Sequence, residues 1–355
     1  MITTTSDLPA ALSDLIRSVP YDRLFVVADE NTVRHCVPLL ADRLDASRII
    51  TIPSGDEHKT LSTLTTVWDA LEVGGATRHS LLVNVGGGVV TDLGGFAAAT
   101  FKRGIRYINV PTTLLAMVDA AVGGKTAINY HGLKNEIGAF HQPEHIILCP
   151  RFLTTLDKEN LLSGMAEMCK HHLLSGPHAA AAMERTADLF TTLLHHPDDD
   201  IYAAAAQAIA DSVTVKERIV TADPTEQGLR KALNLGHTLG HAVEELLLER
   251  GTPVLHGFAV AWGLMGELYL SHLVSAFPLE ALRATTRLLR EFYGCPPIGC
   301  KDYDTLLSLM KHDKKNSSAD TVCFALLNAS GDIRIDCTAS REQVFEAIDF
   351  MRDGC

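Results

Sequence analysis

Residues 81–95 read LLVNVGGGVVTDLGG, an apolar run that continues directly into a glycine-rich turn. An apolar run without polar alternation is typical of a strand buried on both faces, as in the parallel sheets of α/β folds. Glycines between such a strand and a helix let a phosphate approach the backbone, and the helix N-terminus favours its charge. The turn departs from the G-x-G-x-x-G pattern, and close packing explains many such glycines. The stretch therefore predicts an α/β fold, with either a phosphate site or a tightly packed turn here.

Similar apolar runs alternate with helix-like segments through the first 150 residues. They lie at Leu24–Val27, Arg48–Ile52, Arg106–Val110 and His145–Cys149. After about residue 155 the sequence changes to long segments rich in alanine and leucine, which favour helix. These segments are Leu161–Leu174, Ala179–His195, Ile201–Ile219, His241–Glu249 and Phe258–Ala276. We therefore expect an α/β domain with a parallel sheet over residues 1–155 and an all-α domain over residues 156–355, because this length favours two domains.

Composition limits the classes of partner and compartment. The formal net charge is −12, which argues against a nucleic-acid backbone or an anionic membrane as partner. The eight cysteines follow no disulfide or zinc-finger spacing, and several lie in apolar runs as reduced core thiols do. The N-terminal residues lack the pattern of a signal peptide, and no apolar run is long enough to span a membrane. A cytoplasmic location is expected.

Residues 226–244 read EQGLRKALNLGHTLGHAVE and place His237 and His241 four residues apart in a predicted helix. Residues at that spacing share one helix face, and His256 follows a short loop. Clustered neutral imidazoles suit a divalent metal, and spacing alone would assign both helical histidines to it. A lone pair of this kind is more often an ordinary core or surface pair. Arg230 and Asn234, about two turns and one turn earlier, would add an anion-binding side chain and a polar one.

Polar residues in the first half also occur where ligands bind in α/β folds. Asp119 interrupts an apolar run, so a buried carboxylate there needs a fixed partner. Lys125 follows two glycines, and the loop SGDEHK at residues 54–59 offers acids and a lysine. Asp29 and Asn31 follow the first predicted strand, at the carboxyl edge of the sheet. For these two, capping of a helix is the competing interpretation.

Four motifs in order resemble the 3-dehydroquinate synthase family of the sugar-phosphate cyclase superfamily. They are the run 86–138, GMAEMCK at 164–170, the stretch 226–256 and MKHDKKN at 310–316. The resemblance covers nearly the whole chain. It implies an N-terminal NAD-binding domain and a C-terminal helical domain that binds metal and substrate, with the active site in the cleft between them. It also implies a homodimer and one divalent metal ion, zinc or cobalt.

The resemblance assigns roles residue by residue. The implied metal ligands are Glu167, His237 and His256, which leaves His241 to act on the substrate. The other implied substrate or catalytic residues are Lys170, Lys216, Arg230, Asn234, Lys314, Asp119, Asn135 and, across the dimer interface, Arg103. The implied NAD positions are Asp56, Lys59, Gly87, Gly88, Val89, Val90, Thr91, Asp92, Thr112, Thr113, Asp119, Lys125, Lys134, Phe152 and Thr155, to which the strand-edge argument adds Asp29 and Asn31.

The family reaction converts 3-deoxy-D-arabino-heptulosonate 7-phosphate to 3-dehydroquinate and phosphate, a step of aromatic amino acid biosynthesis. Its course is a transient oxidation by NAD, elimination of phosphate, re-reduction and an intramolecular aldol closure. A substrate carrying a carboxylate and a phosphate accounts for basic residues in an acidic chain. Two departures stand out: Phe258 replaces the family's usual Glu after His256 and Gly257, and Asp56 replaces a Glu.

Three other functions remain open at this point. The first is a related cyclase of the 2-deoxy-scyllo-inosose or 2-epi-5-epi-valiolone synthase type, which would keep the NAD and metal residues but change the substrate contacts. The second is a metal-dependent polyol dehydrogenase, whose site needs no ring of lysines. The third is a non-catalytic scaffold that binds a metal or a nucleotide. The retained Arg230, Asn234 and His241 favour the dehydroquinate reaction.

Overall fold

The structure is a computed structural model that describes residues 1–43, 46–131, 133–176, 179–195, 198–312 and 322–353. The chain forms two compact units. The first comprises Met1–Asp157 and His195–Val213, and the second comprises Lys158–Leu194 and Thr214–Cys355. The expected border near residue 155 lies close to the first change of unit, whereas the return of residues 195–213 to the first unit had no signal in the sequence.

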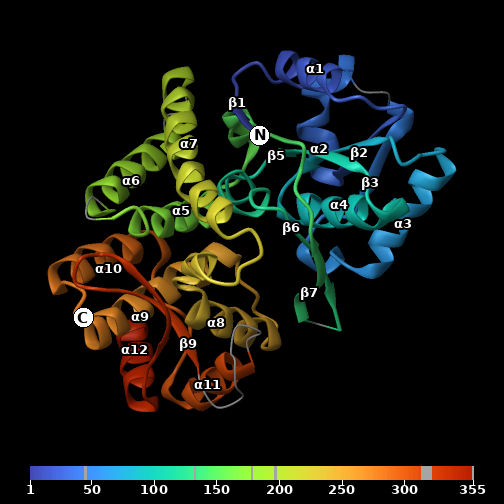
Figure 1. Ribbon diagram of the computed structural model, residues 1–355. Helices are drawn as coiled ribbons and strands as arrows, with labels where there is room; N and C mark the ends of the chain where they lie inside the picture. Colours follow the sequence, from blue (N-terminus) through green and yellow to red (C-terminus); the bar gives the residue numbers. More distant parts are fainter. Residues whose placement is uncertain (44–45, 132, 177–178, 196–197, 313–321, 354–355) are drawn as a thin grey trace. The chain divides into compact units, whose positions relative to one another are not determined.

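The first unit is built on a six-stranded sheet in which every pairing is parallel, with the order β1-β8-β5-β4-β2-β3 (Figure 1). Its strands are β1 (Ile2–Thr4), β2 (Leu24–Asp29), β3 (Ile49–Ile52), β4 (Leu81–Gly86), β5 (Arg106–Pro111) and β8 (His145–Leu148). The five predicted strands are therefore confirmed, and β1 adds an edge strand beside β8. All six residues of β4 are buried, as expected for a central strand covered on both faces.

Four α-helices and several 3-10 turns connect these strands. They are α1 (Leu8–Ser18), α2 (Glu30–His35), α3 (Leu61–Val73) and α4 (Gly88–Thr100). Helix α4 contacts β2, β4 and β5, and its Val90, Leu93 and Ala97 are buried in a core with Val27 and Leu82. The glycine-rich stretch thus joins the central strand to the helix that covers it. The predicted α/β architecture is confirmed.

Two features of this unit have no clear signal in the sequence. Strands β6 (Lys125–Tyr130) and β7 (Leu133–Phe140) form a separate antiparallel pair. Gly138 permits their close approach, because a Cβ there would lie 2.1 Å from the carbonyl oxygen of Thr126. Between β5 and β6, residues Ala116–Ala120 form a single π-helical turn, η5. Such turns are rare and occur frequently at functional sites.

The second unit is mainly helical, as predicted. Its helices are α5 (Lys158–Leu173), most of α6 (Ala179–His195), the C-terminal part of α7 (Asp199–Ala222), α8 (His237–Glu249), α9 (His256–Ser275), α10 (Leu279–Tyr293), α11 (Tyr303–His312) and α12 (Arg341–Asp353). Helix α9 is apolar on nearly all sides and contacts α5, α8, α10 and α12. A helix that is hydrophobic all round belongs in the centre of a domain.

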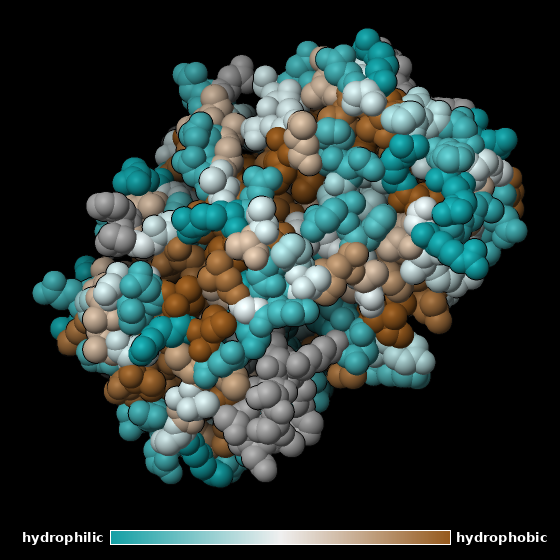
Figure 2. Space-filling model, in the orientation of Figure 1, coloured by the Kyte–Doolittle hydropathy of each residue, from teal (hydrophilic) through white to brown (hydrophobic). Residues whose placement is uncertain are grey.

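The expectation of an all-α second domain is wrong in one respect. Strands β9 (Cys323–Leu327) and β10 (Ile333–Thr338) form an antiparallel hairpin, and β9 contacts α9. The buried run of β9 is too short for a helix, and the turn residues Asn328 to Asp332 end it. Among the described residues no helix is long and apolar enough to cross a membrane. Figure 2 shows hydrophilic side chains spread over the visible face, with apolar patches between them.

Candidate functional site

The three predicted metal ligands lie together in the second unit, each supplied by a different helix. Glu167 lies on α5, and His237 and His256 are the first residues of α8 and α9. Glu167 Oε1 is 3.3 Å from His237 Nε2 and 3.5 Å from His256 Nε2. Ligand atoms bonded tetrahedrally to one zinc ion at 2.0–2.1 Å lie roughly 3.3–3.4 Å apart. The spacing of these atoms therefore fits a single divalent ion.

Glycine contacts bring the three helices close enough for this convergence. A Cβ on Gly257 would lie 2.0 Å from the carbonyl oxygen of Ser163 on α5. A Cβ on Gly263 would lie 1.9 Å from the carbonyl oxygen of Gly236, and one on Gly240 would lie 2.8 Å from that of Ala259. No side chain larger than hydrogen fits at these distances. The glycines in and beside the histidine motifs thus set the helix spacing that the ligands need.

The protonation states of Glu167 and His237 also fit a cation. The side chain of Glu167 is fully buried, yet Lys170, with which it forms an ion pair, and His237 hold its pKa well below the usual value against the effect of burial. Burial, together with the positive charge of Lys170, lowers the pKa of His237 to about 3. Its Nδ1 lies 3.1 Å from the carbonyl oxygen of Leu235, which can only accept a hydrogen bond. The neutral ring therefore turns the Nε2 lone pair towards a carboxylate oxygen, an arrangement that a cation between them stabilises.

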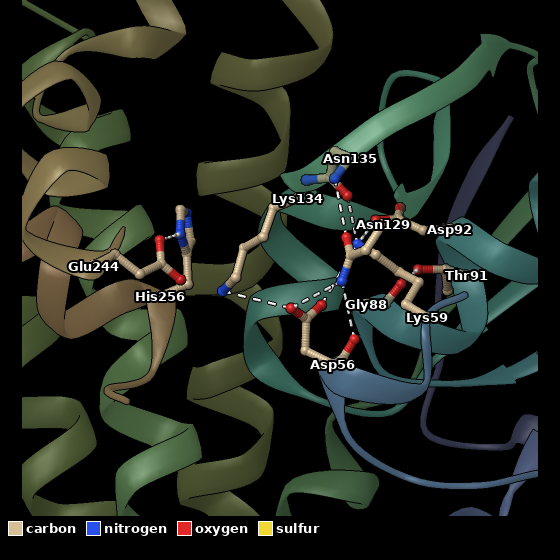
Figure 3. A network of polar contacts seen from close by, with 10 residues as sticks. All are labelled: Asp56, Lys59, Gly88, Thr91, Asp92, Asn129, Lys134, Asn135, Glu244 and His256. Atoms are coloured by element: carbon tan, nitrogen blue, oxygen red, sulfur yellow. Dashed lines mark hydrogen bonds and ion pairs between the residues drawn. The ribbon is translucent and has the colours of Figure 1, made fainter. Parts of the chain in front are cut away.

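His256 has a second carboxylate neighbour, Glu244, which was not among the predicted residues. Its Nδ1 lies 3.2 Å from Glu244 Oε2 on α8 (Figure 3). Burial lowers the pKa of His256, but the charges of Glu244 and Glu167 outweigh that effect and raise it to about 10. A carboxylate on the outer nitrogen fixes the ring orientation of a metal-binding histidine. The available signal was spacing, because Glu244 follows His241 by three residues and so lies near the same helix face.

Phe258 packs against two aromatic side chains. Its ring packs edge-on against Tyr293, with ring centroids 5.3 Å apart, and against Trp262 at 6.3 Å. The residue therefore joins an aromatic cluster rather than the polar surroundings of His256. The carboxylate contact to His256 Nδ1 comes from Glu244 on the neighbouring helix instead.

The third histidine lies in the same cluster. The ring of His241 is 5.2 Å from that of His237 and 5.6 Å from that of His256, so the shared helix face is confirmed. One ligand atom from each of the three rings lies within 4.8 Å of the others. This geometry alone does not divide the histidines into two ligands and one catalytic group. That division stays a prediction.

The residues before α8 are arranged differently from the sequence prediction. Arg230 and Asn234 belong to a 3-10 helix, η7 (Leu229–Asn234), and Gly236 at a φ of 82° separates it from α8. Counting helical turns back from His237 was therefore wrong, because a left-handed residue interrupts the helix. Arg230 is 1 % exposed and donates to the carbonyl oxygen of Pro224 at 2.6 Å. Asn234 donates to Glu226 at 3.2 Å.

Two more basic residues were predicted for this part of the site. Lys216 is buried on the portion of α7 that belongs to the second unit, and Lys170 is buried one turn after Glu167. Buried lysines and arginines concentrate positive charge locally in an acidic chain. Lys314, the third predicted lysine, lies outside the described residues.

In the first unit, the strand order reverses at a position where open α/β sheets bind ligands. From β2 the chain continues to β3 on one side and then to β4 on the other, so the order reverses between β2 and β4. Ligands of open α/β sheets bind outside the carboxyl ends of the strands at such a reversal. Gly87 and Gly88 lie there, at the start of α4, and no side chain caps the helix. Its first amide groups are therefore free of a side-chain cap and suit a phosphate.

A network of polar side chains lies in the same unit (Figure 3). Lys59 is buried and donates to Asp92 Oδ2 at 3.1 Å and to Asn135. Asp56 Oδ2 lies 3.5 Å from Lys134 Nζ and accepts from Asn129 at 3.3 Å. Asn129 was not among the predicted residues, although its side chain also accepts from the backbone amide of Asn135 at 2.9 Å. The network therefore connects the SGDEHK loop to β6 and β7.

The remaining predicted positions differ in what their side chains can reach. The carboxylate of Asp29 accepts from Thr32 in a capping box, so helix capping accounts for it. The side chains of Val90 and Phe152 are buried in the core, which leaves only their backbone groups for a ligand. Exposed or partly exposed side chains belong to Asn31, Val89, Thr113, Lys125 and Thr155, and buried ones to Thr91 and Thr112. Asp119 lies in the π-helical turn, and Arg103 adopts a left-handed backbone with φ 68°.

Comparisons with known proteins show which family the sequence matches. Residues 49–163 match the 3-dehydroquinate synthase N-terminal family, and residues 164–316 match the 3-dehydroquinate synthase C-terminal family. The chain is 48 % identical over 355 residues to a 3-dehydroquinate synthase of Parabacteroides distasonis, covering 99 % of this chain and 98 % of that protein. It is 38 % identical to the one of Salinibacter ruber, covering 91 % and 86 %.

Solved structures with a similar fold include two synthases of other names. A 2-epi-5-epi-valiolone synthase of Streptomyces hygroscopicus with NAD+ and Zn2+ bound gives a TM-score of 0.84 at 25 % identity, covering 99 % of this chain and 96 % of that one. A 2-deoxy-scyllo-inosose synthase complexed with carbaglucose-6-phosphate, NAD+ and Co2+ gives a TM-score of 0.80 at 23 % identity, covering 100 % and 96 %. The latter likeness shows a shared fold.

Proposed function

The chain belongs to the 3-dehydroquinate synthase family, and we propose that it converts 3-deoxy-D-arabino-heptulosonate 7-phosphate to 3-dehydroquinate and phosphate with NAD and one divalent metal ion. The observation that supports this most directly is the convergence of Glu167, His237 and His256. One carboxylate and two imidazoles leave coordination positions open for substrate oxygens, as a catalytic metal site requires.

The bound groups supply two kinds of chemistry. When bound, a divalent ion would supply stabilisation of negative charge on substrate oxygens and NAD would supply reversible redox chemistry, so the net reaction would need no external oxidant. The side chains of this protein hold the substrate and manage its protons and charge. Lys170 keeps Glu167 ionised, and Glu244 orients His256.

His241 is proposed as the polar group that exchanges a proton with the substrate at an imidazole nitrogen. It lies on the same helix face as His237 and within the same histidine cluster. Histidine suits this role because its ordinary pKa is close to neutral pH. Substitution of His241 can distinguish this catalytic role from a role in metal binding.

Basic residues are proposed to bind the two anionic groups of the substrate. In the second unit these are Lys170, Lys216 and Arg230, all buried, together with Lys314. Arg230 offers several N–H donors in a fixed plane, which matches a carboxylate or a phosphate. In the first unit the basic residue Lys125 is proposed to face the substrate as well. The polar residues Asp119 and Asn135 are also proposed to face it.

For NAD, the proposed site is the carboxyl edge of the six-stranded sheet. The first turn of α4 would receive the pyrophosphate, since its amides lack a side-chain cap. Asp56, within reach of Lys59 and Lys134, is proposed to accept from ribose hydroxyls. Asp56 has a shorter side chain than the Glu usual in the family, so the SGDEHK loop would have to lie closer to the cofactor.

The test is an assay of purified protein with the heptulosonate phosphate, NAD and Zn2+ or Co2+, in which phosphate release and 3-dehydroquinate are measured together. We expect equal amounts of both products and loss of activity with a chelator. A metal-loaded protein that releases no phosphate would refute the proposal. Turnover of a sugar phosphate without a carboxylate at a higher kcat/KM would instead indicate a related cyclase, which the 48 % identity to a 3-dehydroquinate synthase disfavours.

Two further proposals concern the oligomeric state of the protein and its location in the cell. We propose a homodimer in which Arg103 contributes to the partner's site, a role that would fit its strained backbone in the FKRG turn. Sedimentation of the wild type and of Arg103→Ala tests the dimer. The buried thiols of Cys36, Cys149 and Cys169 are unpaired by disulfides, which is consistent with a reducing, cytoplasmic compartment.

A further inference from the structure

We propose that Glu267, in the middle of α9, is a positioning residue for the metal site because its carboxylate fixes the first turn of α8. This inference rests on the proposed metal site, and Glu267 is not among the residues proposed above to bind the metal or the substrate. Glu267 is 0 % exposed. Its Oε2 accepts from the amide of Gly236 at 2.6 Å, and its Oε1 accepts from the amide of Leu239 at 3.0 Å.

The start of α8 has no cap from its own sequence. Gly236 occupies the N-cap position, has no side chain, and adopts a left-handed backbone. The first amides of a helix lack partners within the helix, and a buried amide left unpaired destabilises the fold. A carboxylate at a helix N-terminus satisfies these amides and interacts favourably with the helix dipole. Glu267 supplies this cap from another helix, without any solvent contact.

The same two hydrogen bonds fix the backbone on both sides of a predicted ligand. His237 stands between Gly236 and Leu239, so the two hydrogen bonds to Glu267 restrain the backbone on both sides of its Cα. Its ring is held separately by the contact of Nδ1 with Leu235 O at 3.1 Å. Helix α9 also begins with His256. One helix therefore carries one metal ligand and fixes the backbone of another, which couples the two positions.

The experiment compares wild type, Glu267→Gln and Ser271→Ala. Glutamine has nearly the same shape, but one of its two terminal groups is an NH2 that cannot accept, so one α8 amide loses its partner. Ser271 is the matched control. It is buried one turn later on α9, where it donates to the backbone carbonyl of Glu267 and accepts from Leu327 of β9.

The readouts are Co2+ and Zn2+ affinity by chelator competition, the visible absorption of the Co2+ form, and hydrogen exchange in residues 236–240. For Glu267→Gln we expect metal affinity about 10-fold weaker, a changed Co2+ spectrum and faster exchange in this turn. For Ser271→Ala we expect lower thermal stability with wild-type affinity and spectrum. If the variants weaken metal binding equally, the effect is general destabilisation and the inference is overturned.

Two further outcomes distinguish a failure of this inference from a failure of the proposed function. A wild-type protein that binds no divalent metal refutes the proposed site itself, whatever the variants do. Wild-type metal binding with unchanged affinity and spectrum in Glu267→Gln overturns the positioning role alone. If the glutamine variant does not fold, Glu267→Asp replaces it, because it keeps the charge but shortens the reach. Wild-type metal affinity in that variant would also overturn the inference.

Discussion

Replacing Gly257 by alanine should separate two helices that carry proposed metal ligands. The new Cβ would lie 2.0 Å from the carbonyl oxygen of Ser163, whereas ordinary contact begins at 3.4 Å, so the first turn of α9 must move by about 1.4 Å. His256 immediately precedes this residue and lies 3.5 Å from Glu167. Metal sites tolerate ligand displacements of only about 0.2 Å. We therefore expect the affinity for Zn2+ or Co2+ to fall on the order of 100-fold.

Chelator competition measures this affinity, and urea unfolding of the metal-free protein measures the accompanying overpacking, expected to destabilise by about 1–3 kcal/mol. Gly299→Ala is the control, since a Cβ there meets no atom within 4 Å and the backbone is extended. The control should leave both quantities unchanged. Wild-type metal affinity in Gly257→Ala would refute the reasoning that glycine contacts set the spacing of the ligands.

Three further predictions concern single side chains. His237→Ala should abolish metal binding, whereas His241→Ala should retain the metal and lower kcat; loss of metal from both variants would show that both are ligands. Glu244→Gln should weaken metal binding about 10- to 100-fold in a competition titration, because the carboxylate orients a ligand; unchanged affinity would make Glu244 a bystander. Burial raises the pKa of the Asp302 carboxyl, but the ion pair with the partly exposed Arg250 and the backbone amide of Gly299 outweigh that effect and hold the pKa below its usual 3.8. This ion pair should stabilise the folded protein by about 1 kcal/mol. The contribution should be fully present above pH 3.8 and disappear as the pH falls through the lowered pKa of Asp302. The difference in free energy of unfolding between wild type and Arg250→Met should therefore be constant from neutral to mildly acidic pH and shrink below it; a difference that grows in acid would contradict the assignment.

Much of the first unit could be predicted because its signals are local. The run Leu81–Val85 is apolar apart from Asn84, and so short a run followed by glycines favours a buried strand. The β9–β10 hairpin was missed because its strands are short and lie among long helices, where a five-residue apolar run has no distinctive period. The order of the strands was also beyond prediction, since pairing depends on contacts between residues far apart in the chain.

For the candidate site, the sequence by itself determined which residue types were available. The four-residue spacing of His237 and His241 placed them on one helix face, and the motifs supplied Glu167 and His256 as partners. Only the tertiary structure decided that atoms from three helices converge, because this depends on glycine-to-backbone contacts that leave no room for a Cβ. It alone also revealed Glu244 and Glu267, whose carboxylates act on groups 12 and 31 residues away. A hydrogen bond requires proximity in space, and local sequence patterns carry no record of which distant residues the packing of helices brings within hydrogen-bonding distance.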